Sequence, residues 1–283
     1  MSYVDHPEKR QKHPHYEHRT QKLDRKDNEF SSKKFHQVRK VSTHKKLLRS
    51  FGRIGMCLNE KSTDSIPIGD LDKVCFILIN DYDNDKDYDL GVGPLNDGYL
   101  IGLKHHRFGF KVFYLYNPRS DLFTSFLGFF IKNTQNALTV FYSGRDTTES
   151  TIHGIQFANG SLSSGVVGDT IAQNCNGKAR VMFITDTCGG GSVFDINAIC
   201  ANATTVPKNM VSFYTRKVAA PDSKEGKRSH GIFTYYFSKI TSDCPNITPN
   251  RLITRMNASL KRFEESMNCE VTDSQTPDLP IFN

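Results

Sequence analysis

Cys188 is the residue whose surroundings point most directly to chemistry. An apolar run leads into it and three glycines follow, in the stretch RVMFITDTCGGGSV (180–193). Such glycines let backbone N–H groups approach a ligand closely, as an anion or oxyanion site requires. A thiol in that electropositive position ionises more readily, and the thiolate is the nucleophilic form. The pattern favours a nucleophilic cysteine, and the simpler alternative is a buried cysteine in a glycine-rich turn.

A second strand end carries polar residues of an unusual kind. The apolar run 136–144 ends in FYSGRD (141–146), which places Ser143, Arg145 and Asp146 just where the strand should stop. In open α/β sheets, reactive groups gather outside the carboxyl ends of the strands. We therefore expect this stretch and the Cys188 stretch to lie at the same edge of one sheet.

The elements that must position these residues follow from hydrophobic patterning. Apolar, β-branched runs predict five buried strands and one shorter strand with a turn, at 74–80, 110–117, 136–144, 179–186, 208–216 and 152–160. Helical spacing predicts helices at 94–109, 119–134, 161–177, 231–241 and 248–266. Asn96 or Asp97 is the expected cap of the first helix, and Thr248 caps the last, with Pro249 at its first position.

The alternation of these elements predicts the fold class. Strands separated by helices require right-handed crossovers and a mainly parallel sheet with helices on both faces. No internal repeat is evident, so we expect a single α/β domain.

The order of these motifs resembles that of the caspase-like cysteine peptidases, and most closely the metacaspases. In that family one strand ends in Ser-Gly-His-Gly, which carries the catalytic histidine, and the next core strand ends in Asp-Ser-Cys-His-Ser-Gly, which carries the nucleophile. Similar motifs stand here at 142–144 (YSG), 186–190 (DTCGG), 91–98 (GVGPLNDG), 231–237 (GIFTYYF) and 274–282 (SQTPDLPIF). The resemblance implies a caspase-like domain over residues 68–283.

The resemblance also implies roles for particular residues. Cys188 would be the nucleophile, and the backbone at Gly144 and Gly189 would receive the oxyanion. The remaining pocket residues would bind the side chain before the scissile bond; they are Asp97, Ser143 and Asp186. Two carboxylates favour a cationic side chain by charge pairing. The expected partners are therefore protein or peptide substrates with Arg or Lys before the scissile bond.

The catalytic histidine of the family is missing. Arg145 occupies its position, and an arginine stays protonated in proteins, so it cannot accept and return a proton. Arg145 could hold Cys188 as a thiolate by charge, but loss of a positioned acid–base group costs on the order of 10²–10⁴-fold in rate. His153, eight residues further on, is one candidate for a displaced base. Its place in a short strand gives the alternative that it is only a strand residue.

Two functions follow from these residues. The first is a metacaspase-like homologue, impaired or inactive because the histidine is missing, that binds substrates or regulates proteolysis, for instance by pairing with a related active peptidase. The second is an active cysteine endopeptidase that cleaves after Arg or Lys, with Cys188 as nucleophile.

An acidic run, DYDNDKDYD (81–89), raises the question of calcium, which the resembled family often uses. The run lacks the glycine at its sixth position and the glutamate at the twelfth that an EF-hand loop needs. Calcium binding here and a solvated acidic loop are the two alternatives, and no other cofactor is expected.

The excess positive charge of the chain lies at its amino end. Residues 1–50 contain 14 Lys/Arg and 6 Asp/Glu, whereas the other 233 residues contain 23 and 24. This segment has few aliphatic residues and no periodicity, so we expect a disordered basic arm over 1–50. A solvated tail is the simpler interpretation, and contact with nucleic acid or acidic membranes is the alternative.

Cysteine usage and hydropathy bear on location. Seven scattered cysteines without a C-x-x-C spacing, no apolar run of transmembrane length and no signal-like amino end favour a cytoplasmic or nuclear protein with reduced thiols.

Overall fold

The computed structural model describes residues 44–83, 89–149, 152–187, 193–196, 199, 209–217, 231–261, 267–273 and 280–282. These residues all belong to one compact unit, Thr43–Asn283. No described helix is both long and apolar enough to cross a membrane.

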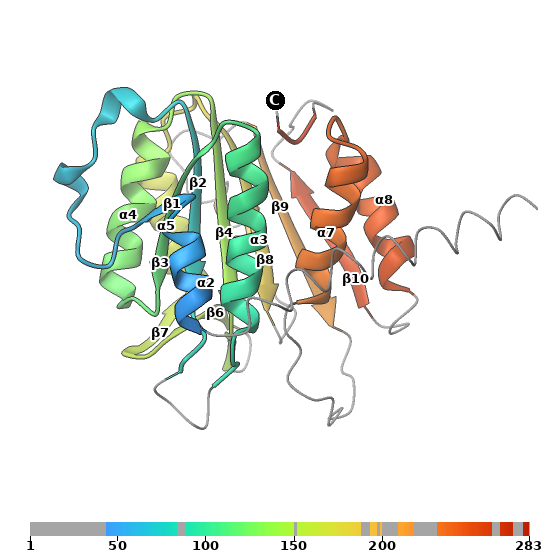
Figure 1. The fold of residues 1–283 in the computed structure, drawn as a ribbon, viewed down its shortest axis with the longest axis horizontal. Coiled ribbons are helices and arrows are strands. Elements are labelled where there is room, and N and C mark those ends of the chain that lie inside the picture. Colours follow the sequence, from blue (N-terminus) through green and yellow to red (C-terminus); the bar gives the residue numbers. More distant parts are fainter. Residues whose placement is uncertain are drawn as a thin grey trace, which may run out of the picture. The chain divides into compact units, whose positions relative to one another are not determined.

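A seven-stranded sheet forms the centre of this unit (Figure 1). Its strands, in their spatial order, are β1 (Gly55–Cys57), β3 (Lys111–Tyr116), β2 (Lys73–Ile79), β4 (Ala137–Gly144), β8 (Arg180–Thr187), β9 (Met210–Lys217) and β10 (Met267–Asp273). All neighbours run parallel except β10, which pairs antiparallel with β9. The mainly parallel sheet predicted from the sequence is therefore confirmed.

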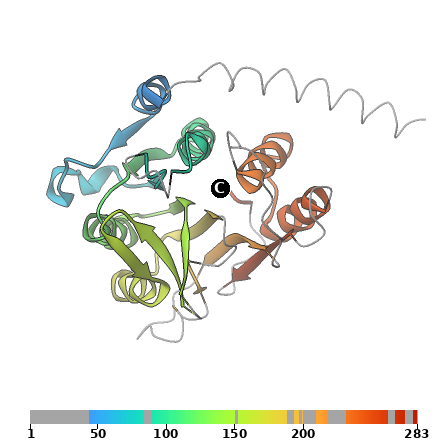
Figure 2. The same ribbon diagram turned by 90° about the horizontal axis from the view of Figure 1, so that it is seen from below.

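Helices cover both faces of this sheet, as the view in Figure 2 shows. One face carries α3 and α7, and the other carries α4 and α5. The described helices are α2 (His44–Phe51), α3 (Gly93–Arg107), α4 (Ser120–Asn133), α5 (Ser164–Asn174), α7 (Ile232–Asp243) and α8 (Pro249–Leu260), with short 3-10 turns η1 (Thr63–Ser65) and η2 (Ile68–Asp70). The prediction of a sheet with helices on both faces is therefore confirmed.

The core lies between the central strands and α4. All eight residues of β4 are buried, as are six of the seven in β2. Aromatic rings fill the space beneath them: Phe76 of β2 packs 5.9 Å from Phe123 and 5.0 Å from Phe130, measured between ring centroids. This double-sided burial explains why both strands read as continuous apolar runs.

A small second sheet follows β4. It consists of β5 (Asp146–Glu149), β6 (Ile152–Phe157) and β7 (Gly160–Ser163), joined antiparallel in that order. Ile155 and Phe157 are buried in the main core and anchor this sheet. The helix predicted over 161–177 begins later, at Ser164, where the Ser163 hydroxyl accepts a hydrogen bond from the backbone N–H of Val166 at 3.4 Å.

Three sequence-based boundaries are wrong. The last residues of the arm predicted over 1–50 are folded, because His44–Phe51 forms α2 and buries Leu47 and Phe51, whereas residues 1–43 lie outside the described residues. The folded unit likewise begins before residue 68, since it includes β1 and η1. Helix α3 starts at Gly93, so neither Asn96 nor Asp97 caps it. Thr248 and Pro249 do take the predicted positions at the start of α8.

Candidate functional site

The two unusual strand ends are neighbours. Strands β4 and β8 pair in parallel, with Ser143 opposite Asp186 and Gly144 opposite Thr187. The sequence-based expectation that both stretches share one sheet edge is confirmed. Cys188 and Gly189 follow Thr187 directly in the chain and lie outside the described residues, so their predicted roles stay predictions.

Asp97 reaches this edge from α3. It is 2% exposed, and its Oδ2 atom accepts a hydrogen bond from the Ser143 hydroxyl at 3.3 Å. The backbone N–H of Gly231 donates to both carboxylate oxygens of Asp97, at 2.8 and 3.0 Å. Asp97 therefore joins α3, the end of β4 and the start of α7.

Asp186 makes the corresponding contacts from β8. Its Oδ2 atom accepts two hydrogen bonds from Thr234, one from the backbone N–H at 3.0 Å and one from the hydroxyl at 2.6 Å. Thr234 lies in the first turn of α7, where backbone N–H groups have no partner inside the helix. The three residues predicted to share a pocket, Asp97, Ser143 and Asp186, are thus brought together over the amino end of α7.

The electrostatics of this carboxylate pair are unfavourable to ionisation. Burial raises the pKa of Asp97 well above its ordinary value, and the charge of Asp186 raises it further, against the hydrogen bonds from Gly231 and Ser143. Burial of its carboxyl also raises the pKa of Asp186, against the hydrogen bonds from Thr234. Such perturbed groups at the carboxyl edge of a sheet are typical of functional sites. A cationic ligand would relieve the repulsion between the two carboxylates.

Gly231 has a structural role that the sequence did not reveal. A Cβ atom at this position would overlap the Asp186 carboxylate. Only a glycine therefore permits the amino end of α7 to sit against both Asp97 and Asp186. In the sequence, Gly231 is only a glycine directly before an apolar helical run. That pattern does not identify Asp97, 134 residues away, as its partner.

Arg145, which the sequence analysis predicted to stand at the position of the family histidine, follows β4 and is partly buried. Its backbone N–H donates to the Tyr82 hydroxyl at 3.3 Å, and its carbonyl accepts from the Gln156 N–H at 3.1 Å and from the Tyr142 hydroxyl. Gly144 is required beside it, because a Cβ there would lie 2.6 Å from the Tyr142 oxygen. Packing against Tyr142 is thus one sufficient reason for a glycine at 144, and the oxyanion role remains a prediction.

His153, the candidate displaced base, lies in the middle strand of the small sheet. It is exposed and pairs with Thr148 of β5. His153 is thus a strand residue, as the alternative interpretation predicted. Its role as a base stays a prediction.

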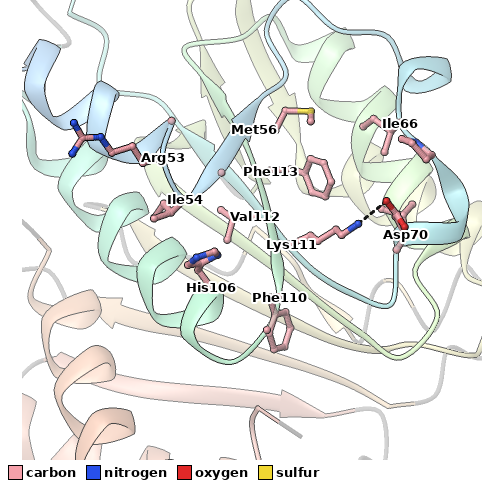
Figure 3. Close-up of a pocket in the computed structure, with 15 residues that line it drawn as sticks. Arg53, Ile54, Met56, Ile66, Asp70, His106, Phe110, Lys111, Val112 and Phe113 are labelled. Carbon is pink, nitrogen blue, oxygen red and sulfur yellow. Dashed lines mark ion pairs between the residues drawn. The ribbon is translucent and has the colours of Figure 1, made fainter.

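A separate cavity of about 760 Å³ lies away from the carboxylate pair (Figure 3). It runs along β1 and the amino end of β3, with Ile54, Met56 and Val112 among its apolar lining residues. An ion pair between Lys111 and Asp70, 2.8 Å from Nζ to Oδ2, closes one side. This cavity holds none of the residues that the sequence singled out.

Comparisons with known proteins support the fold. No family model matches the chain, and no curated protein sequence matches it. Among solved structures, the crystal structure of the Drosophila initiator caspase Dronc is similar, with a TM-score of 0.57 and 10% sequence identity. The match covers 74% of this chain and 82% of the Dronc chain. The chain therefore has a caspase-like α/β fold.

Proposed function

We propose that this chain is a metacaspase-like cysteine peptidase homologue that binds Arg or Lys side chains of proteins and is impaired in hydrolysis. The observation that carries the proposal is the pair formed by the buried Asp97 and the partly buried Asp186, beside Ser143, at the sheet edge that leads into Cys188. A buried carboxylate beside a second, partly buried one is costly to maintain, which favours a ligand-binding role over a purely structural one.

The specificity for a cation follows from the oxygens that the fold leaves available. Among the hydrogen bonds of the described residues, Asp186 uses only Oδ2. Its Oδ1 atom can therefore accept from a guanidinium or ammonium group, and a bound cation would favour ionisation of Asp97 as a second negative charge. An acidic side chain in the same place would supply no such counter-charge and would be rejected.

The impairment follows from Arg145. A peptidase of this type needs a group that takes a proton from the thiol and returns it to the leaving amine. A guanidinium can do neither, because it remains protonated. Binding without efficient turnover is the expected result, and it would let the protein hold basic substrates or regulate a related active peptidase.

Peptide binding tests the proposal without relying on catalysis. Fluorescence anisotropy of a labelled peptide ending in Arg is compared with that of the same peptide ending in citrulline, which keeps the shape and loses the charge. A charge-assisted hydrogen bond corresponds to roughly 10–100-fold in affinity. We therefore expect the Arg peptide to bind that much more tightly than the citrulline peptide.

The matched variants are Asp186→Asn, which should remove most of the preference, and Asp64→Asn, an exposed carboxylate of η1 that should leave it unchanged. Equal affinity of the wild-type chain for both peptides would contradict the proposal.

A further inference from the structure

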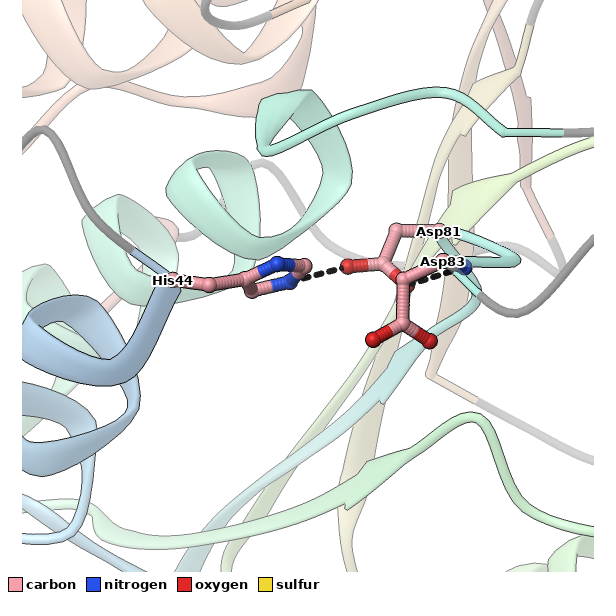
Figure 4. A group of neighbouring side chains, drawn as sticks. All are labelled: His44, Asp81 and Asp83. Atoms are coloured by element: carbon pink, nitrogen blue, oxygen red, sulfur yellow. Dashed lines mark hydrogen bonds and ion pairs between the residues drawn. The ribbon is translucent and has the colours of Figure 1, made fainter. Parts of the chain in front are cut away.

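Three side chains with metal-binding atoms, none of them part of the carboxylate pair, converge at the carboxyl end of β2 (Figure 4). His44 is the first residue of α2, and Asp81 and Asp83 lie in the segment after β2, so the fold joins two parts of the chain about 37 residues apart. One ligand atom from each residue lies within 4.8 Å of the other two. His44 therefore adds a nitrogen ligand to the acidic run 81–89, which contains no histidine of its own.

The burial of this cluster distinguishes it from a solvated acidic patch. The side chain of Asp81 is 0% exposed and that of His44 is 29% exposed. The two are in contact, with 2.6 Å between His44 Nε2 and Asp81 Oδ2. Buried carboxylates in proteins are paired with cationic groups or coordinate metals. Asp83 is exposed, which leaves a side from which an ion can enter.

Residues outside the cluster orient both carboxylates. The Tyr116 hydroxyl lies 3.0 and 2.8 Å from the two oxygens of Asp81. The Asn117 side-chain N–H₂ group donates to Asp81 Oδ1 at 2.8 Å and to Asp83 Oδ1 at 3.0 Å. Metal-ligating carboxylates are commonly held by such outer hydrogen bonds, which fix their direction.

We propose that His44 Nε2 and one carboxylate oxygen each from Asp81 and Asp83 bind a single divalent metal of the zinc class. An imidazole nitrogen selects zinc and its transition-metal neighbours, whereas calcium and magnesium prefer oxygen ligands alone. Three protein ligands with water at the fourth position complete a tetrahedral site.

The required atomic movements are small. Ligand atoms about 2.05 Å from a tetrahedral metal lie about 3.4 Å apart. The His44–Asp81 contact must therefore open by less than 1 Å, and the exposed Asp83 side chain can swing inward. The metal takes the place of the hydrogen-bonded proton between Nε2 and Oδ2, which is released to solvent, and the neutral imidazole keeps its hydrogen on Nδ1. The Tyr116 hydroxyl, 2.7 Å from Nε2, gives up that contact and keeps its hydrogen bond to Asp81.

Such a metal would connect α2 to the edge of the main sheet. Asn80, next to Asp81, donates its backbone N–H to the Ser143 carbonyl at 3.0 Å and its side chain to the Gln156 carbonyl at 2.8 Å. The metal would thereby stabilise the segment that contacts the end of β4. This inference does not depend on the proposed peptidase-like function.

Thermal unfolding of the full chain tests the site. After treatment with a chelator and its removal, the protein is melted with and without Zn²⁺ at about 100 times the measured Kd. We expect Zn²⁺ to raise Tm by roughly 5–10 °C, because a ligand that binds only the folded state stabilises it. Five other histidines lie within the first 50 residues, so binding alone is not diagnostic, and the Tm shift is the primary measurement.

Matched variants locate the site. His44→Ala and Asp83→Ala should each lose the Zn²⁺-dependent shift, whereas His106→Ala and Asp64→Ala, which remove an exposed histidine and an exposed carboxylate, should keep it. Co²⁺ bound in place of Zn²⁺ should give a tetrahedral visible absorption band that Asp83→Ala abolishes.

Three results would each overturn the proposal. They are no Zn²⁺ shift in the wild-type chain, a full shift in both site variants, or a larger shift with Ca²⁺ than with Zn²⁺.

Discussion

At the scale of single residues, Asp97 and Asp186 are the most informative pair in the molecule. Each has a raised pKa, and the main cause is burial, to which the charge of Asp186 adds at Asp97. The folded protein therefore tolerates an arrangement that opposes its own stability at neutral pH. Groups that destabilise a fold in this way are expected where a ligand supplies the missing counter-charge.

Asp97→Asn should stabilise the unliganded protein at neutral pH. Because the pKa of Asp97 is raised on folding, stability falls as pH rises from the unfolded value of about 3.9 through the folded value. The amide removes this penalty and can still accept from Gly231. We expect a gain of about 1 kcal/mol or more at pH 7.5 that shrinks as the pH is lowered, measured by urea unfolding. A loss of stability that is constant with pH would show that the carboxylate is needed for its hydrogen bonds.

His105→Phe tests a second buried group, on α3. Burial lowers the pKa of His105 to about 4, while its Nδ1 atom lies 2.8 Å from the Ile101 carbonyl. Between about pH 6.5 and 4 the unfolded chain binds a proton that the folded chain does not, so stability falls as the pH is lowered. The loss of stability caused by His105 reaches on the order of 3 kcal/mol at pH 4, because each pH unit between the two pKa values corresponds to about 1.4 kcal/mol.

In His105→Phe this part of the acid sensitivity should be absent, and His106→Phe, at an exposed neighbouring position, should retain it. The measurement is the free energy of unfolding against pH for the three proteins. An unchanged slope in His105→Phe would contradict the account of His105.

At the scale of elements, α7 and its amino end organise the carboxylate pair. Gly231 and Thr234 give Asp97 and Asp186 their backbone hydrogen bonds, so the approach of this helix determines the position of both carboxylates. The positive end of the helix dipole also faces them, which partly offsets their repulsion.

Gly231→Ala should separate this helix from the pair. The new Cβ atom would overlap the Asp186 carboxylate, and overpacking of this kind costs about 1–3 kcal/mol. Gly165→Ala is the control, because a Cβ at Gly165 in α5 would meet only the Ser163 hydroxyl, at an ordinary contact distance of 3.7 Å, and alanine favours a helix. Thermal unfolding should show a lower Tm only for Gly231→Ala. Equal values for both variants would mean that α7 does not pack against Asp186 as described.

The strongly patterned elements were predictable from the sequence, and the others were not, for physical reasons. β2 and β4 are buried on both faces, so an apolar run identifies each of them. α2 buries only Leu47 and Phe51 and lies in a lysine-rich segment, so its sequence is not distinguished from the basic segment before it. β1 has three residues, two of them exposed, and β10 is an edge strand of polar composition, so neither gives a clear periodic signal.

At the scale of the whole molecule, topology made part of the site predictable. Parallel strands bring their carboxyl ends to one edge, which was enough to predict that the strand ends carrying Ser143 and Asp186 share that edge. The meeting of His44 with Asp81 and the docking of Gly231 on Asp97 depend on tertiary packing across 37 and 134 residues. No local pattern in the sequence encodes those distances.

The fold itself persists with little sequence identity. The chain shares 10% identity with Dronc over an alignment with a TM-score of 0.57. Strand order and double-sided burial depend on which positions are apolar rather than on which apolar residue is present. The residues that carry chemistry can therefore diverge while the sheet that presents them is kept.

Hydrolysis of a fluorogenic peptide ending in Arg is the measurement that tests the central claim most directly. The wild-type chain, Cys188→Ala and the double variant Arg145→His, Asp146→Gly are compared under the same conditions, with and without Ca²⁺. The account predicts that the wild-type rate is at the level of Cys188→Ala, and that the double variant exceeds it by at least about 100-fold, since a positioned acid–base group contributes on the order of 10²–10⁴-fold. Wild-type hydrolysis well above the Cys188→Ala rate would contradict it, because the chain would then be a working peptidase with another base.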